Sequence, residues 1–268
     1  MSENFLLPAE LSEFAVSLAK TLSSHYSTKV LRSQLLENAP QNRPLLPENI
    51  SAWQAIAESG ALLACLPESS GGLGFGTLAA QLVVLKSGKA LATAPLFETV
   101  TFGITPLLAA PDSPAQKSWL TAIAEQNQAW SGGFEELLAG TELNVVTTAN
   151  KIGEPTSLTG QVRFVPAVER VSRLVIPAVD SQKNIVLAVL DLNAPGSSST
   201  FIPSLDILRP YYEVKLTNAQ ATVLACFAPQ SPELGRMLDR MRLLVASEMT
   251  GAASQAVQLS VDYAKTRQ

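Results

Sequence analysis

The longest regular pattern of apolar positions lies at the end of the sequence, over residues 233–268. Apolar side chains recur there at steps of three and four, which is the spacing of one face of an α-helix. Ser231 and Pro232 precede the pattern and give a start signal, because serine caps a helix and proline fits its first turn. Small residues, among them Gly251, line the middle of the segment. We predict one long helix that packs closely against another surface.

The first 125 residues repeat this spacing in shorter segments, which prolines, glycines and capping residues separate. The pattern predicts a helical N-terminal part. Its helices are expected after Pro8, from Pro47 to about Gly60, over residues 77–91 and 97–108, and from Ser113 onward.

The pattern changes near Ala129, where short runs rich in β-branched and aromatic residues begin. No helical pattern lies between these runs, so they indicate an antiparallel sandwich or barrel rather than parallel β-α-β units. The predicted strands are residues 143–148, 158–165, 173–179, 185–192 and 221–227.

A glycine-rich run at residues 71–76 contains G-x-G, which also occurs in dinucleotide-binding loops. That fingerprint requires a preceding strand and a β-α-β unit. Predicted helices flank the run in this sequence. We interpret it as a structural loop in which glycine permits positive φ angles.

Charge and composition exclude several classes of partner. The formal net charge is −4, and no run of lysine or arginine occurs, so nucleic acid is not expected as a partner. No apolar run approaches the roughly 18 residues of a membrane span. Charged residues make up 16% of the chain, against roughly 25% in typical soluble domains. This low charge favours an oligomer that buries additional surface.

The sequence offers little for nucleophilic or metal chemistry. His25 is the one histidine, and we expect a surface or capping role for it. No cysteine or histidine spacing matches a metal site. Cys65 and Cys226 lie in apolar contexts, which is typical of reduced, buried thiols in a cytoplasmic protein.

Three stretches carry more specific runs of residues: LPESSGGLG at 66–74, LTGQVRFV at 158–165 and VDYAKTRQ at 261–268. In the same order they resemble the P-E-x-x-G-G-x-G loop, the L-N-G-x-K-x-W/F-I hairpin and the Y-A-x-x-R-x-x-F-G element of the acyl-CoA dehydrogenase family. The resemblance implies an α+β multidomain fold. Residues 1–125 would form an all-α domain, 126–228 a middle β-barrel or sandwich domain, and 229–268 the first long helix of an incomplete C-terminal helical domain.

The family resemblance also implies a reaction. A carboxylate removes a proton from the carbon α to an acyl-CoA thioester, and a hydride passes from the β carbon to FAD, which makes the protein an oxidoreductase of lipid metabolism. The family forms dimers or tetramers, so a homo- or hetero-oligomer with another acyl-CoA dehydrogenase chain is expected.

The same alignment implies positions for the cofactor-binding residues. Phe134, Glu135 and Gly140 fall where the family carries the Thr, Glu and Ser of its T-E-P-x-x-G-S flavin motif. Phe164 falls at the aromatic residue that shields the flavin, and Pro166 at a flavin-contacting threonine. Phenylalanine, glycine and proline offer no side-chain hydroxyl for those hydrogen bonds.

The terminal helix carries the remaining implied positions. The position of a helix-borne catalytic base falls on Met241, whose thioether cannot accept a proton at neutral pH. Arg267 falls at an arginine that reaches FAD phosphates across the dimer interface, and the alternative for it is a solvated helix end. We expect Arg242 to pair with Asp239 one turn earlier.

Carboxylates near these positions have two interpretations. Glu248 is either a displaced base or, the interpretation we favour, a charge on the outer face of the helix. Glu135, Glu136 and Asp239 are expected to be solvated, and no pair of acids stands out as general acid and base.

Three hypotheses follow for the function. The chain is an FAD-dependent acyl-CoA dehydrogenase, either shortened or with its C-terminal part outside this sequence. Alternatively, it is a non-catalytic partner subunit of a hetero-oligomeric acyl-CoA dehydrogenase. The third hypothesis is a scaffold that has lost cofactor binding.

Overall fold

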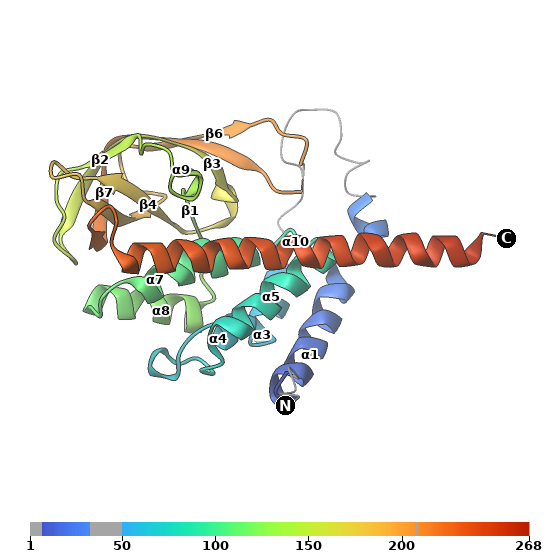
Figure 1. The fold of residues 1–268 in the computed structure, drawn as a ribbon. Helices are drawn as coiled ribbons and strands as arrows, with labels where there is room; N and C mark the ends of the chain where they lie inside the picture. Colours follow the sequence, from blue (N-terminus) through green and yellow to red (C-terminus); the bar gives the residue numbers. More distant parts are fainter. Residues whose placement is uncertain (1–6, 33–49, 207, 268) are drawn as a thin grey trace.

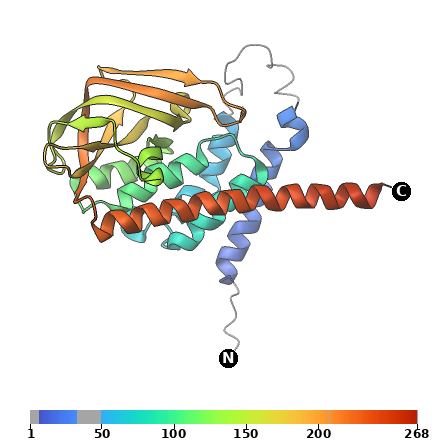
Figure 2. The same ribbon diagram turned by 45° about the horizontal axis from the view of Figure 1, so that its top comes forward.

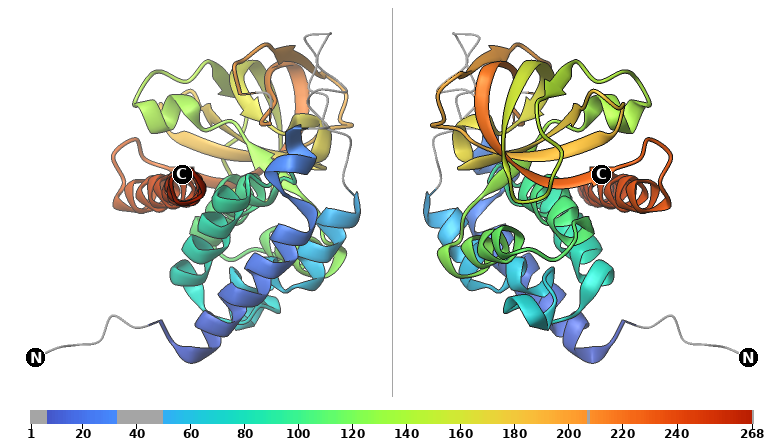
Figure 3. Two further views of the ribbon diagram at one scale, coloured as in Figure 1. Left: turned by 90° about the vertical axis from the view of Figure 1, so that its right-hand side faces the viewer. Right: turned by 90° about the vertical axis from the view of Figure 1, so that its left-hand side faces the viewer.

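A layer of helices lies beneath a β-barrel, and one long helix runs along the seam between them (Figures 1 and 3). The structure is a computed structural model that describes residues 7–32, 50–206 and 208–267. The helical layer consists of α1 (Ala9–His25), α3 (Ile50–Glu58), α4 (Ala61–Ala64), the 3₁₀ turn η1 (Glu68–Ser70), α5 (Gly76–Ala90), α6 (Leu96–Glu98), η2 (Thr99–Ile104), α7 (Thr105–Ala109) and α8 (Pro114–Gln126).

The helices agree with the apolar pattern except in two places. The predicted first helix is interrupted at Tyr26, whose backbone is extended, and residues 28–32 are helical again. The predicted helix 97–108 is not uniform, because residues Thr99–Ile104 form a π-helix between two short α-helices. The predicted helix start at Pro47 lies outside the described residues.

The glycine-rich run after η1 is a structural loop, as predicted. Gly71, Gly74 and Gly76 have φ angles of 79°, 71° and 69°, which favour glycine. At Gly72 an added Cβ would lie 2.2 Å from the backbone oxygen of Leu66. The run follows a 3₁₀ turn and not a strand, so it lacks the context of a dinucleotide-binding loop.

Five strands close into a ring in the order β4-β2-β3-β7-β5 and back to β4. The strands are β1 (Trp130–Gly132), β2 (Val145–Thr147), β3 (Pro155–Pro166), β4 (Arg173–Val179), β5 (Ile185–Asp191), β6 (Ser197–Ile202) and β7 (Tyr211–Phe227). β1 and β2 share one edge of β4, and β6 and β5 share one edge of β7. Leu158, Val162, Leu174, Ile176, Tyr212 and Val214 belong to the apolar cluster that fills this barrel.

The barrel confirms the predicted fold class and corrects two details. It is mixed rather than wholly antiparallel, because β4 pairs parallel with both β1 and β2. β1, β6 and the first half of β7 were not predicted. β1 has only three residues and β6 is rich in serine, but the first half of β7 does alternate, with Tyr212, Val214 and Leu216 buried.

The predicted terminal helix is α10 (Pro232–Thr266), and the hydroxyl oxygen of Ser231 caps it by accepting a hydrogen bond from the Leu234 N–H at 3.2 Å. Its first half is amphipathic and packs on the helical layer, with its last buried residue at Gly251. The second half projects from the body (Figure 2). Val257 and Tyr263 there are 64% and 65% exposed.

Helices α5 and α10 cross at backbone contact through two glycines. A Cβ added to Gly88 would lie 2.2 Å from the Glu248 backbone oxygen, and one added to Gly251 would lie 2.0 Å from that of Leu85. The small residues in α10 therefore admit a neighbouring helix, as the sequence predicted.

We expect Gly251→Ala to lower the free energy of unfolding by about 1–3 kcal/mol, because its methyl group forces the two helices apart. Gly235→Ala in the first turn of α10 is the matched control. An added Cβ there meets nothing within 4 Å, so it should gain up to about 1 kcal/mol from helix propensity. Urea unfolding monitored by circular dichroism compares the two, and equal effects would contradict the close crossing.

Candidate functional site

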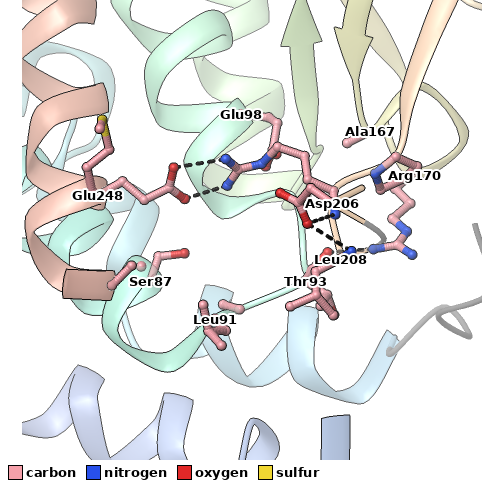
Figure 4. Close-up of a pocket in the computed structure, with 15 residues that line it drawn as sticks. Ser87, Leu91, Thr93, Glu98, Ala167, Arg170, Asp206, Leu208 and Glu248 are labelled. Atoms are coloured by element: carbon pink, nitrogen blue, oxygen red, sulfur yellow. Dashed lines mark hydrogen bonds and ion pairs between the residues drawn. The ribbon is translucent and has the colours of Figure 1, made fainter. Parts of the chain in front are cut away.

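Two adjoining cavities lie between the barrel and α10. The aromatic cavity, of about 520 Å³, is lined by Phe97, Phe102, Phe134, Phe164 and Tyr211 together with residues of α9 (Glu135–Ala139) and α10. The polar cavity, of about 230 Å³, extends from Ser87 and Leu91 to Arg170 and Asp206 (Figure 4). Both are lined by Arg209, Glu248 and Met249, so these three residues separate them.

The aromatic rings form the walls of the larger cavity. Phe134 is buried and stacks on Phe102 with a centroid distance of 5.9 Å. Phe164 has a φ angle of 55° at a bulge in β3, an unusual conformation for a non-glycine residue. Phe164 is 39% exposed, and its ring is in edge contact with Tyr211 and beneath the guanidinium of Arg163.

The structure brings four of the predicted positions together in this cavity. Phe134, Glu135, Phe164 and Pro166 all line it, although they come from different elements. Gly140 lies outside it, as the residue with positive φ that ends α9.

The two remaining predicted positions on α10 do not line the described cavities. Met241 is fully buried in the apolar core beneath the helix. Arg267 is exposed at the end of α10. Val245, Glu248 and Met249 are the residues that α10 contributes to the aromatic cavity.

Glu248 is not the outer-face charge that the sequence favoured. Its carboxylate accepts two hydrogen bonds from Arg209, one of them of 3.0 Å from Nη1, while Arg209 Nε lies 3.0 Å from the Glu98 carboxylate (Figure 4). We call these three residues the Arg209 cluster. Its side chains are only 24%, 6% and 12% exposed for Arg209, Glu98 and Glu248. The apolar pattern of α10 could not reveal this burial, because other elements cover the helix on more than one side.

Elements distant in the sequence position the cluster. Asp206 Oδ1 accepts hydrogen bonds from the Leu208 and Arg209 N–H groups at 3.0 and 3.3 Å, which shapes the loop before β7. The guanidinium lies 4.6 Å from the centre of the Phe97 ring. Glu98 ends α6 at the start of the π-helix, a distortion that often marks functional sites.

Burial and charge act in opposite directions within the cluster. Burial raises the pKa of Glu248, although the guanidinium of Arg209 lowers it in part. Burial alone would lower the pKa of Arg209, but the carboxylates of Glu98 and Glu248 raise it above its ordinary value. Arg209 therefore stays charged, and its pairing compensates the cost of burying both carboxylates.

Other predictions about charged side chains are mostly confirmed. Arg242 pairs with Asp239 at 2.8 Å and also donates to the Leu138 carbonyl at 3.4 Å. Asp239 and Glu135 are exposed, as predicted. Glu136 is only half-buried, but its Oε2 is buried and has no hydrogen-bond partner among the described residues, so the prediction of a solvated side chain was wrong for this oxygen.

The two thiols show no sign of reactivity. Cys65 and Cys226 are free, and burial raises the pKa of Cys65 to about 12, which makes it an inert thiol. Cys226 is half-buried rather than fully buried. His25 lies in the last turn of α1. In the described ranges no cluster of metal-ligating side chains occurs, and no helix there is long and apolar enough to span a membrane.

Comparison with known proteins decides the fold. Residues 21–127 match the family "Acyl-CoA dehydrogenase, N-terminal domain". The chain is similar to the ChsE4-ChsE5 complex from Mycobacterium tuberculosis, with 18% identity, a TM-score of 0.81, and coverage of 99% of this chain and 69% of that one. This chain has the acyl-CoA dehydrogenase fold. The resemblance noted in the sequence is confirmed by the family match over residues 21–127 and by the shared fold.

Two further structures with this fold are similar along the chain. Butyryl-CoA dehydrogenase from Megasphaera elsdenii is 18% identical with a TM-score of 0.78, and coverage is 99% of this chain and 71% of that one. A glutaryl-CoA dehydrogenase from Mycobacterium smegmatis in complex with FADH2 is 14% identical with a TM-score of 0.78, and coverage is 100% and 68%. No curated protein matches the chain by sequence.

The acyl-CoA dehydrogenase fold implies FAD, and the aromatic cavity offers apolar walls to its ring but only part of the hydrogen bonding that its polar edge needs. The pyrimidine edge of a flavin needs hydrogen-bond donors at its carbonyl oxygens and an acceptor at its N3–H. Arg209 is paired with two carboxylates, and the Tyr211 hydroxyl is in hydrogen-bonding contact with Arg209. Glu135 offers a carboxylate, which is an acceptor. Arg209 is the donor to Tyr211, so the Tyr211 O–H remains available, whereas the hydroxyl groups that the family motifs imply at Phe134 and Pro166 are absent from the described lining.

Replacement of Arg209 by methionine should lower the free energy of unfolding by about 3–5 kcal/mol at neutral pH, because it leaves buried carboxylates without a cation. Burial raises the pKa of Glu248 above 4.5, so the folded state holds its proton more tightly than the unfolded state. The loss in Arg209→Met should therefore shrink as the pH falls from 7.5 toward about 4.5. Urea unfolding at several pH values measures it.

Arg236→Met is the control for that experiment, because Arg236 forms only an exposed pair with Glu233. It should change stability by less than about 0.5 kcal/mol at every pH. Adding Glu98→Gln and Glu248→Gln to Arg209→Met should restore part of the lost stability. A pH-independent loss in Arg209→Met would argue against buried charge as its cause.

Proposed function

We propose that this chain is a non-catalytic subunit of a hetero-oligomeric acyl-CoA dehydrogenase. One observation carries the proposal: the carboxylate that α10 presents to the aromatic cavity is engaged by Arg209. Removal of a proton α to a thioester requires a base with a free lone pair within reach of the substrate. Both oxygens of Glu248 accept from a charged guanidinium, so Glu248 is a structural anion rather than a base.

The other implied positions support the same conclusion. Met241 is in the apolar core and carries no basic atom. Phe134 and Pro166 stand where the family motifs carry hydroxyl-bearing residues. In this structure they form part of the apolar wall of the aromatic cavity. The chain thus keeps the architecture of the fold, while Met241 stands at the family's helix-borne base position and Phe134 and Pro166 stand at two of its hydroxyl positions.

The exposed half of α10 gives such a subunit its role. Val257, Leu259, Val261 and Tyr263 present apolar surface to solvent, which is typical of a surface that a partner covers. In a complex with a complete dehydrogenase chain, FAD on that chain would accept the hydride from the substrate. Arg267, at the end of the helix, would then donate hydrogen bonds to the phosphates of the partner's flavin, the role that the family resemblance implies.

The alternative is an acyl-CoA dehydrogenase that works alone with its own FAD. The size of the aromatic cavity and the ring of Phe164 in its wall favour this alternative, since a flavin ring stacks on aromatic side chains. It requires that the Arg209 cluster open to release a base.

Absorbance distinguishes the two functions. We expect the chain purified alone to lack a flavin band between 300 and 550 nm, and to co-purify with flavin only when co-expressed with a complete acyl-CoA dehydrogenase chain. Stoichiometric flavin on the isolated chain, together with oxidation of an acyl-CoA, would establish the alternative and reject a non-catalytic subunit.

Within the complex, Arg267→Ala should weaken flavin binding by about tenfold to a hundredfold, because one charge-assisted hydrogen bond contributes about 1.5–3 kcal/mol. Lys265→Ala, which removes a neighbouring charge from the same helix end, should leave it within about twofold. Flavin retention after dialysis, followed by fluorescence, measures both variants. Equal retention in the two variants would reject the assignment of Arg267.

A further inference from the structure

A third cavity is lined by residues of α1, α5 and α10 and by none of the barrel strands. Figure 1 shows α10 passing these two helices before it leaves the body. The cavity has a volume of about 730 Å³. It is lined by the end of α1 and the residues after it, by the last turns of α5, and by α10 from Ala252 to Leu259. None of these residues lines the aromatic cavity, and Leu91 and Ala252 are the two it shares with the polar cavity.

The charge of this cavity is opposite to that of the chain. Among the described residues, Lys20, Lys86 and Lys89 line it and no aspartate or glutamate does, although the whole chain has a net charge of −4. Lys86 and Lys89 lie one turn apart on α5 and therefore share a face. Neither these two nor Lys20 forms an ion pair in the described part of the chain. We call the cavity the lysine groove.

The floor of the lysine groove is apolar. Leu22 and Tyr26 are buried there, and Ala252 and Ala256 keep the α10 side open because their side chains are small. The Tyr26 hydroxyl oxygen accepts a hydrogen bond from the Ala94 N–H at 3.2 Å, which fixes the ring. A cationic rim over a fixed apolar floor is the arrangement that suits a ligand with an anionic head and a hydrocarbon tail.

We propose that the lysine groove binds a fatty acid, with the carboxylate between the three ammonium groups and the tail on the floor. The volume lies in the range of about 300–1,000 Å³ that small-molecule sites occupy. The groove is concave, and its cations come from two helices rather than from one flat face, which favours a single amphipathic molecule over a membrane surface. The site is independent of the role proposed above for the chain.

Fluorescence titration tests the site on the full chain. A dansyl-labelled undecanoic acid should bind with one probe per chain, and laurate below its micelle concentration should displace it. Dodecanol and dodecyltrimethylammonium share the tail but lack the anion, so they should displace it at least about tenfold less well. Raising the salt concentration should weaken binding of laurate, because exposed charges are screened.

Variants locate the binding. The triple variant Lys20→Gln, Lys86→Gln and Lys89→Gln should bind laurate about tenfold more weakly, since each exposed pairing contributes a few tenths to about 1 kcal/mol. The matched triple Lys117→Gln, Lys151→Gln and Lys215→Gln removes the same charge elsewhere and should bind as the parent does. Ala256→Trp, which fills the floor, should abolish binding. Unfolding midpoints confirm that each variant is folded.

Several results would overturn the proposal. They are a failure of the parent chain to bind laurate, equal weakening in the two lysine triples, and binding to anionic vesicles without binding to monomeric laurate. Loss of binding in Val245→Trp, which fills the aromatic cavity, with no loss in Ala256→Trp would place the ligand elsewhere and would also reject it.

Discussion

A buried guanidinium joins three parts of the molecule that the sequence keeps far apart. Arg209 comes from the loop that leads into β7, Glu98 from the start of the π-helix, and Glu248 from the middle of α10. Burying these charges is costly, and only their mutual pairing compensates the cost. The barrel, the helical layer and the long helix therefore depend on one another for the arrangement seen here. The same pairing separates the aromatic cavity from the polar one.

This arrangement differs from what a catalytic centre requires. An enzyme that abstracts a proton needs a carboxylate that is desolvated but free to accept it. In this chain Glu248 is desolvated and already paired, and Phe134 and Pro166 line the same cavity where the family implies hydroxyl groups. The fold is retained, while the polar groups in its cavity stabilise the folded state. Fold and chemistry are separable in this way because function depends on individual side chains placed on a common scaffold.

Much of the architecture could be predicted from the sequence. Ser231 and Ser113 cap helices where their capping role was predicted, and β4 has its predicted bounds. These features depend on local chemistry, which a linear sequence carries directly. The elements that the sequence did not predict depend on contacts made elsewhere in the fold. β1 is a strand only because β4 pairs with it, and the π-helix is invisible to a three- and four-residue period.

The candidate site could be predicted only in part for the same reason. Alignment with family motifs placed Phe134 and Phe164 in one cavity because those positions are fixed by the fold. It could not predict that Glu248 meets Arg209, since that contact joins residues thirty-nine positions apart across two separate parts of the molecule. The interpretation of Glu248 as an outer-face charge assumed that one side of α10 is exposed to solvent. Packing against α5 and the loop before β7 removes that solvent.

The projecting half of α10 has a mechanical consequence. Its last buried residue is Gly251, and Arg267 stands sixteen residues further along, about 24 Å at the rise of an α-helix. A rigid rod held at one end acts as a lever, so a tilt of about 5° at the glycine crossing would move the tip by about 2 Å. A distance of that size decides whether a hydrogen bond forms. Small changes in the packing of α5 against α10 are thus amplified at the far end of the helix, beyond the three cavities.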